Sequence, residues 1–207
     1  MKTPHEGEPL LTYEDATHEY RLDGKRVPSV TQVLECAGII PKYDGDPWYG
    51  ERGAAVHRAC EMLDKGEMAV EDLTEEHTAI AGFVRSYALW VAVNKPEYTR
   101  VEVPFACTKT DCVYAGRVDR TMKHKVNGQD CEITLDLKTS SPKWYHDHQL
   151  ALYAYGLGLS PMRAGLYLHE DGEIATLKEY TKAETLTEAL AAVKVFWAVH
   201  NHRRDWQ

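Results

Sequence analysis

The sequence predicts an α/β domain organised around one β-hairpin at residues 116–139. Asn127-Gly128 separates two strand-like runs there, and a two-residue type I′ turn needs positive φ at both of its central positions. Apolar residues recur at helical spacing before and after the hairpin, at about 51–65, 75–94 and 142–156. A chain of 207 residues that is 43% hydrophobic is long enough for one domain with a substantial core.

The predicted turn also sets the pairing of the two strands. With residues 127 and 128 as the loop, Asp119 lies opposite Asp136. Because side chains on a strand repeat with period two, Arg117 shares a face with Asp119, and Lys138 shares that face with Asp136. Facing Cβ atoms lie roughly 4.5–5.5 Å apart, where like charges are destabilising. The two carboxylates therefore favour a cation between them.

Three motifs follow one another along this part of the chain. They are Gly-x-x-Asp at 116–119, hydrophobic-Asp-hydrophobic-Lys-Thr at 135–139, and Gln149-x-x-x-Tyr153, which begins eleven residues after Lys138. In this order and spacing they resemble the PD-(D/E)XK nuclease superfamily, specifically its RecB-like, phage-type exonuclease branch. The resemblance covers about residues 18–180. It implies a restriction-endonuclease-like αβββαβ core with a central mixed sheet flanked by helices.

The same resemblance implies a divalent-metal-dependent deoxyribonuclease. Asp119 and Asp136 would hold Mg²⁺ or Mn²⁺, since hard cations prefer oxygen ligands. The backbone carbonyl of Leu137 and the imidazole of His57 complete the implied ligand set. Lys138 is placed to orient the attacking water or to stabilise the developing charge.

The helix predicted at residues 51–65 carries His57. From spacing alone, His57 and Glu61 are an i, i+4 pair, which on its own favours a surface pair. The resembling family carries Arg-Gly-x-x-x-His-x-x-x-Glu on an early helix, and the run that starts at Arg52-Gly53 matches it. By that resemblance, His57 is a metal ligand and Glu61 supports the site.

A packing helix at residues 75–94 and a strand at 99–107 come next. The strand contains Glu102, which matches a frequently acidic position of the family and is a candidate to support the site. A solvated strand glutamate is the alternative.

After the hairpin, Ser140-Ser141-Pro142 predicts the start of a helix. Gln149 and Tyr153 fall on one side of it, as in any amphipathic core helix. By the resemblance they line the active groove, where Gln149 contacts the substrate or the reacting water and Tyr153 contacts the nucleic-acid backbone. Arg117 and Trp144 are further candidates for substrate binding. The implied catalytic residues are Asp119, Asp136, Lys138, Gln149 and Tyr153.

The two ends of the chain predict additions to this core. Residues 10–36 predict a hairpin and a short helix, appended to a single nuclease domain that spans 1–207. Residues 39–50 predict an irregular loop, whose Trp48 and Tyr49 either pack onto the core or stack on bases. Towards the C-terminus the sequence predicts strands at 163–170 and 174–180 and a final helix opened by the capping box Thr181-x-x-Glu184.

Composition limits the function classes. A net charge of −8 argues against a broad basic nucleic-acid-binding surface, whereas a nuclease confines its contacts to a local groove where a metal neutralises its carboxylates. The five cysteines lack close pairing and predict free thiols. Iron–sulfur members of the branch carry three cysteines after the Gln-x-x-x-Tyr helix, and this chain has none after Cys131, so no cluster is expected. Without an apolar span or a signal peptide, we expect a cytoplasmic protein that does not enter a membrane.

Three functional hypotheses follow. The first is an exonuclease acting on DNA, which in relatives works with a single-strand annealing protein. The second is a structure-specific endonuclease, and the third is a non-catalytic DNA-binding protein that retains the nuclease fold. The sequence leaves open the polarity, the strand preference and the oligomeric state.

Overall fold

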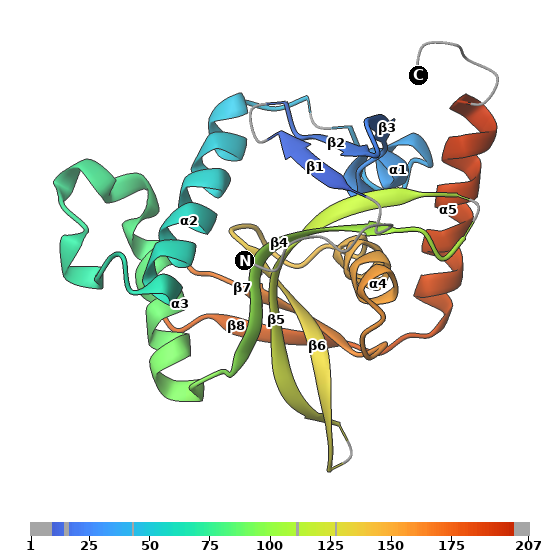
Figure 1. Cartoon of the computed structure of the whole chain (residues 1–207). Coiled ribbons are helices and arrows are strands. Elements are labelled where there is room, and N and C mark those ends of the chain that lie inside the picture. The colour runs from blue at the N-terminus through green and yellow to red at the C-terminus, as the bar shows by residue number, and fades with distance from the viewer. Residues whose placement is uncertain (1–9, 15–16, 43, 111, 127, 201–207) are drawn as a thin grey trace.

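The structure is a computed structural model that describes residues 10–14, 17–42, 44–110, 112–126 and 128–200. Its centre is a five-stranded mixed sheet in the order β4-β5-β6-β7-β8 (Figure 1). β6 and β7 are parallel, and the other neighbouring pairs are antiparallel. The strands are β4 Tyr98–Cys107, β5 Tyr114–Val126, β6 Gln129–Lys138, β7 Arg163–Tyr167 and β8 Thr176–Tyr180.

Helices cover both faces of this sheet, as predicted (Figure 1). On one side an apolar cluster joins the sheet to α2 and α3, and on the other side a second cluster joins it to α1, α4 and α5. Two short 3₁₀ turns, Val70–Asp72 and Glu75–His77, precede α3. The helices are α1 Val30–Cys36, α2 Pro47–Lys65, α3 Thr78–Asn94, α4 His146–Leu157 and α5 Glu184–His200. Among the described residues, no helix has both the length and the apolar character needed to cross a membrane.

The central hairpin has the predicted register. Its pairs run from Val126 with Gln129 to Arg120 with Leu135. Gly128 has a φ of +79°, as the second position of a type I′ turn requires. The first turn residue lies outside the described residues. The hairpin extends well beyond the helices, so that its closed end is remote from the layered part of the molecule (Figure 1).

Regular pairing between β5 and β6 gives way to a side-chain contact where the predicted site begins. Beyond Arg120 and Leu135, the Asp119 carboxylate accepts a 2.7 Å hydrogen bond from the backbone N–H of Leu137. A side chain thus takes the place of a backbone acceptor at this end of the hairpin. The hairpin brings Asp119 beside the residues around Asp136, as the register predicts.

The N-terminal appendage is a separate three-stranded sheet followed by α1. The third strand was not anticipated, and the sheet comprises β1 Leu11–Glu14, β2 Glu19–Leu22 and β3 Lys25–Val27. The backbone N–H of Ala115 in β5 donates to the carbonyl of Pro28 at 2.9 Å, which ties the appendage to the central sheet. Ser29 and Gln32 then form a capping box that starts α1.

Three helix starts differ from the predictions. α5 begins at Glu184, so Thr181 lies too far before it to be the residue that caps it. α2 begins at Pro47, before the expected position, because the Asp46 side chain accepts from the N–H of Trp48 at 2.9 Å and proline fits the first helical turn. Trp48 and Tyr49 therefore belong to a helix and not to a loop. α4 begins at His146 and not near Pro142, since residues 139–145 are not helical and Lys143 donates its N–H to Nδ1 of His146 at 3.3 Å.

Candidate metal and catalytic site

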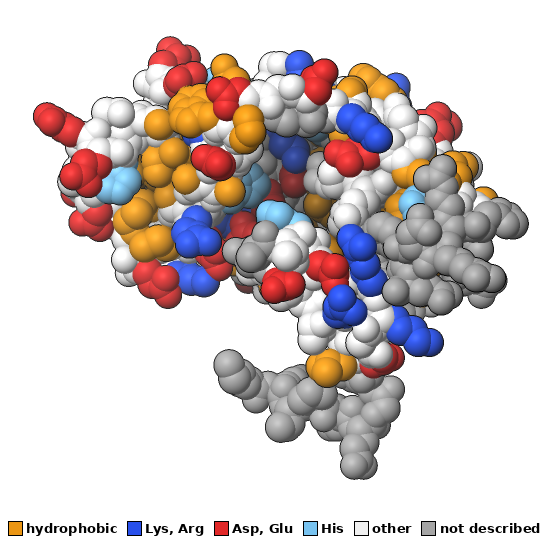
Figure 2. Space-filling model, turned by 90° about the horizontal axis from the view of Figure 1, so that it is seen from above, with side chains coloured by type: hydrophobic (Ala, Val, Ile, Leu, Met, Phe, Trp, Pro, Cys, Tyr) orange, Lys and Arg blue, Asp and Glu red, His pale blue; other side chains and the backbone are white. Residues whose placement is uncertain are grey.

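A cavity of about 900 Å³ opens between α2, the N-terminal sheet and strands β4 and β5. Figure 2 shows a hollow on the face seen from above, with acidic, basic and histidine side chains inside it and hydrophobic side chains along its border. The charged and polar residues that line the cavity include His57, Glu61, Glu102, Arg117, Asp119 and Lys138.

Three side chains with metal-binding atoms meet on the floor of this cavity. One ligand atom each of His57, Glu102 and Asp119 lies within 4.8 Å of the other two. Nδ1 of His57 is 3.4 Å from a carboxylate oxygen of Asp119 and 3.9 Å from one of Glu102. The other ring nitrogen, Nε2, lies 3.1 Å from the carbonyl oxygen of Leu137. Of the four predicted metal ligands, His57, Asp119 and the Leu137 carbonyl therefore come together. Glu102 joins them.

Helix α2 places His57 in the cavity through its choice of small residues. Gly50, Gly53 and Ala54 line the cavity on the same helix face, and a Cβ at Gly53 would meet only Thr139 at 3.8 Å. The opposite face carries the fully buried Val56, which joins the apolar cluster between α2 and the sheet. The helix is thus anchored on one side and leaves room above the imidazole on the other.

Glu102 occupies a strained position in β4. Its φ of +52° is unfavourable for a residue with a side chain and costs about 1–3 kcal/mol. Two arginines hold its carboxylate, Arg117 at 2.9 Å and Arg120 at 3.0 Å. These contacts direct the carboxylate towards His57 and offset the strain. The Glu102 side chain is only 7% exposed and belongs to the cluster, so it is not a solvated strand glutamate.

Arg120 is a residue that the sequence reasoning missed. It is fully buried, its Nε lies 2.6 Å from the carboxylate of Asp64 at the end of α2, and its Nη1 reaches Glu102. Tyr87 of α3 donates to the same Asp64 at 2.7 Å. The sequence did contain a signal for it. Arg120 shares a strand face with the apolar Val118 and Met122, and a charged residue at such a position is expected to be buried and paired.

The predicted catalytic residues form a second line beside the cluster. The Lys138 ammonium is paired with the Asp136 carboxylate and donates to the amide oxygen of Gln149 at 3.0 Å. Gln149 in turn donates to the hydroxyl of Tyr153 at 2.9 Å. Asp136, expected as a metal ligand, lies outside the group of three and is held by Lys138.

The glycine of the Gly-x-x-Asp motif has a steric reason. A Cβ at Gly116 would lie 2.9 Å from the rings of both Phe105 and Tyr153, which is too close. The two rings meet edge to face at 5.7 Å, directly against the backbone of β5. Only glycine lets Tyr153 approach the strand that carries Asp119.

Burial and mutual charge shift the pKa values of the cluster. Burial opposes protonation of His57, but the Asp119 carboxylate outweighs it and raises the pKa of His57 to about 9. Burial likewise opposes ionisation of Asp119, yet His57 holds the pKa of that carboxyl below its usual range. Burial, reinforced by Asp119, raises the pKa of Glu102 to about 7. Burial also raises the pKa of Asp136 to about 6. The cluster carries excess negative charge that a proton on His57 partly offsets.

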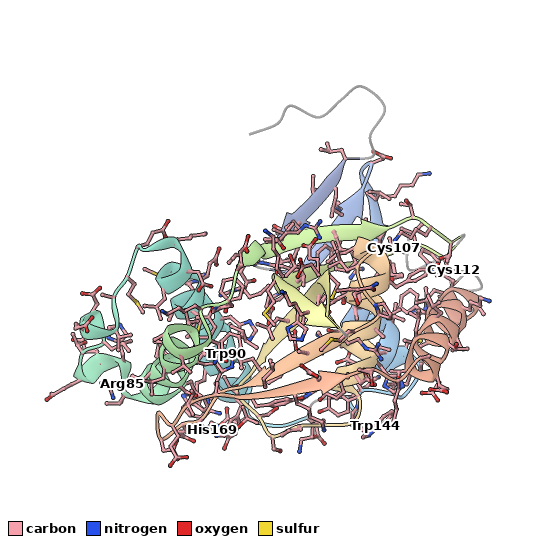
Figure 3. The ribbon with its side chains drawn as sticks, turned by 90° about the horizontal axis from the view of Figure 1, so that it is seen from below. Arg85, Trp90, Cys107, Cys112, Trp144 and His169 are labelled. Carbon is pink, nitrogen blue, oxygen red and sulfur yellow. The ribbon has the colours of Figure 1, made fainter. Side chains whose placement is uncertain are left out.

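The remaining predicted residues lie around the cavity or away from it. Glu61 contacts Lys65 at 2.5 Å and Arg117 at 3.7 Å, so it supports Arg117 and lies outside the three-residue cluster. Trp144 is 63% exposed, is not among the residues that line the cavity, and packs edge to face on His148. Figure 3, which views the molecule from the side opposite to Figure 2, shows Trp144 at the periphery.

Comparisons with known proteins give little guidance. No family model matches the chain, and no curated protein matches it. Among solved structures, the crystal structure of SSO0001 matches over 86% of this chain and 77% of its own, with 13% sequence identity and a TM-score of 0.40. A likeness at this level carries no inference about what the chain does.

Proposed function

We propose that the chain is a divalent-metal-dependent nuclease of the PD-(D/E)XK superfamily, with a restriction-endonuclease-like core, that hydrolyses phosphodiester bonds in DNA. The observation that carries this proposal is the meeting of His57, Glu102 and Asp119 beside Lys138 on the floor of one cavity. The three sequence motifs at 116–119, 135–139 and 149–153 support the same assignment.

The donor set suits a hard divalent cation. Two carboxylates, one imidazole and the carbonyl of Leu137 offer mainly oxygen ligands, as Mg²⁺ and Mn²⁺ prefer, and the geometry leaves open space above them for solvent and phosphate. Such an ion would act as a Lewis acid that offsets phosphate charge and makes a nearby water more acidic. His57, Glu102 and Asp119 would hold it.

Lys138 is the residue best placed to act on the reacting groups. Gln149 and Asp136 fix its ammonium, so the charge is oriented before substrate arrives. In this position Lys138 orients the attacking water or stabilises the negative charge that develops on the phosphate. Gln149 and Tyr153 keep the ammonium in place, and Tyr153 also lines the cavity.

The acidic net charge is compatible with DNA binding at this cavity. The cavity lining includes the cationic side chains of Arg58, Arg117 and Lys138 in addition to its carboxylates. Arg117 holds Glu102 through Nε and lines the cavity, so it orients a ligand and contributes positive charge to the space where a phosphate would bind. The positive charge is local, as a nuclease of −8 net charge requires.

The proposal is tested by incubating the purified chain with end-labelled linear DNA, covalently closed circular DNA and RNA, each with Mg²⁺, Mn²⁺ or a chelator. We expect metal-dependent loss of linear DNA from its ends, with Asp119→Asn inactive. Nicking of closed circles would replace the exonuclease assignment by an endonuclease. A chain that is inert on every substrate with either ion, but still binds DNA, is a non-catalytic binding protein, and the proposal then fails.

A further inference from the structure

Two exposed aromatic side chains lie next to each other at the start of α2, one of them in the cavity lining. Trp48 and Tyr49, in the first turn of α2, are 44% and 54% exposed, and their rings meet at 5.1 Å and 76°. Tyr49 lines the cavity itself. Half of the surface of each side chain is therefore directed to solvent, so covering the core does not account for the pair.

The pair is held in place from beneath. The guanidinium of Arg52 lies 4.9 Å from the centre of the Trp48 ring and 5.3 Å from that of the Tyr49 ring. It also lies 4.8 Å from the ring of Phe83, which belongs to α3. The Arg52 side chain is only 11% exposed, so it acts as a buried support and not as a surface charge. Asp46 fixes the helix start just before the pair. The two rings are therefore oriented before any ligand binds.

A path of small residues connects the pair to the candidate metal cluster. Gly50, Gly53 and Ala54 line the cavity between Tyr49 and His57, and a Cβ at Gly50 would meet nothing within 4 Å. Eight residues of α-helix separate Tyr49 from His57, a distance of about 12 Å along the axis. That distance corresponds to roughly three nucleotides of a stacked strand.

The opposite wall of the cavity is also aromatic. Tyr13 and Tyr20 of the N-terminal sheet stack at a ring distance of 4.7 Å and both line the cavity. The guanidinium of Arg117 lies 5.6 Å from the Tyr13 ring. Flat rings and cations thus border the cavity on two sides, which is the combination that binds single-stranded nucleic acid through base stacking and phosphate contacts.

We propose that the Tyr49 ring, braced edge to face by Trp48, stacks an unpaired base of a single-stranded DNA segment, about three nucleotides from the phosphate at the His57 cluster. This inference rests on the proposed nuclease function and specifies its substrate class. In a duplex both faces of a base are covered by neighbouring bases, so only an unpaired base or a strand end offers a face to these rings. The substrate is therefore DNA with a single-stranded segment, and not continuous duplex.

The test measures binding in chelator, where no hydrolysis occurs, with a fluorescent single-stranded oligonucleotide. Trp48→Leu and Tyr49→Leu keep apolar bulk but remove the flat ring, and we expect each to weaken binding about tenfold. Trp48→Phe and Tyr49→Phe should bind nearly as wild type does. Leu89→Ala truncates a side chain of similar exposure, 47%, on α3 and should change nothing. Covalently closed circular duplex, which has no strand ends, should bind more weakly than the single strand, and all variants should bind it alike.

An abasic nucleotide moved along the oligonucleotide locates the stacked base. We expect one position, about three nucleotides from the phosphate at the His57 cluster, at which removing the base weakens binding to wild type as much as Tyr49→Leu weakens binding to the intact strand. Removing the same base should weaken binding to Tyr49→Leu little further. Single-stranded RNA of the same sequence shows whether the sugar matters. The inference is overturned if wild type does not bind single strands, or if the Leu variants bind them as wild type does. If the protein binds single strands in this way but never cleaves DNA, the proposed nuclease function is wrong and the proposed stacking site is still supported.

Discussion

Glu102 is held in place by opposing local forces. Its positive φ is unfavourable, and its side chain, 7% exposed, lies beside Asp119 in a site that disfavours a second negative charge. The contacts to Arg117 and Arg120 offset both penalties. Strain that persists because the surroundings determine it is typical of functional positions. The positive φ and the contacts to the two arginines together indicate that the Glu102 carboxylate is positioned to bind a ligand.

Replacing Arg120 tests how much its contacts to Asp64 and Glu102 contribute to the free energy of unfolding. Arg120→Met would leave the carboxylates of Asp64 and Glu102 buried without their shared cation, so we expect the free energy of unfolding to fall by about 3–5 kcal/mol. Arg100→Met is the matched control, because Arg100 pairs with Glu132 at 3.6 Å near the surface, and it should cost less than about 1 kcal/mol. Chemical denaturation of both variants gives the comparison, and equal losses would contradict the proposed role of Arg120.

Lys138 is expected to act on the reaction and not on the metal. Lys138→Ala removes the ammonium near the reacting phosphate, so the turnover rate should fall by about 10² or more while divalent-ion affinity stays close to that of wild type. Lys123→Ala, at an exposed lysine on the same hairpin, should leave the rate unchanged. Rates of DNA cleavage and calorimetric metal titrations measure the two quantities separately. Near-normal turnover in Lys138→Ala would remove Lys138 from the mechanism.

At the scale of elements, local signals predicted the hairpin well. Asn127-Gly128 fixes the register of β5 and β6 from the turn to Arg120 and Leu135, because turn geometry and period-two alternation act over short range. The contact of the Asp119 carboxylate with the Leu137 N–H did not follow from that register. It depends on how the hairpin end meets β4 and α2, and turn chemistry alone carries no information about such packing.

The start of α2 shows where a readable signal was missed. Asp46-Pro47 is a cap followed by a residue suited to the first helical turn, but the surrounding glycines and aromatics resembled a loop. The displaced boundary changes what Trp48 and Tyr49 can do, since helical geometry now points Tyr49 into the cavity. The third N-terminal strand was missed for a different reason, because Lys25–Val27 is too short to show a period.

The contact between α3 and the β7–β8 connection provides a test at the element scale. A Cβ at Gly82 would overlap the backbone carbonyl of Glu170, which cannot move as easily as a side chain. Gly82→Ala should therefore destabilise the protein by about 1–3 kcal/mol, although alanine favours helices. Gly50→Ala in α2 meets nothing within 4 Å and should be neutral or stabilising. If thermal unfolding showed Gly82→Ala to be as stable as wild type, the close approach would be wrong.

At the scale of the whole molecule, the candidate site is assembled from segments far apart in sequence. α2 supplies His57, β4 supplies Glu102, and β5 supplies Asp119. The motifs predicted the identity of most of these residues, and they predicted a central mixed sheet flanked by helices. They named Glu102 as a candidate to support the site but not as one of the three grouped ligands, and they did not predict that Asp136 would be paired with Lys138. Both outcomes depend on distances set by tertiary packing.

Divalent ions should stabilise the folded chain if the cluster binds them. A ligand bound only by the folded state raises its stability, so Mg²⁺ or Mn²⁺ should raise the melting temperature of wild type. Asp119→Asn should lose most of this response. Asp136→Asn tests whether Asp136 is a metal ligand, as the sequence predicted, or stays paired with Lys138. The variant should lose the rise in melting temperature only if Asp136 leaves Lys138 to bind the ion. Equal metal responses in wild type and Asp119→Asn would show that the ion does not bind at this cluster.

In the proposed site, His57, Glu102 and Asp119 hold a catalytic divalent ion at the floor of the cavity. Diffraction from crystals grown with Mn²⁺, recorded at its absorption edge, locates the ion directly. We predict an anomalous peak about 2.0–2.3 Å from the carboxylate oxygens of Asp119 and Glu102 and from a ring nitrogen of His57. The account is contradicted if protein that cleaves DNA with Mn²⁺ shows no peak at these three residues, or shows its peak elsewhere.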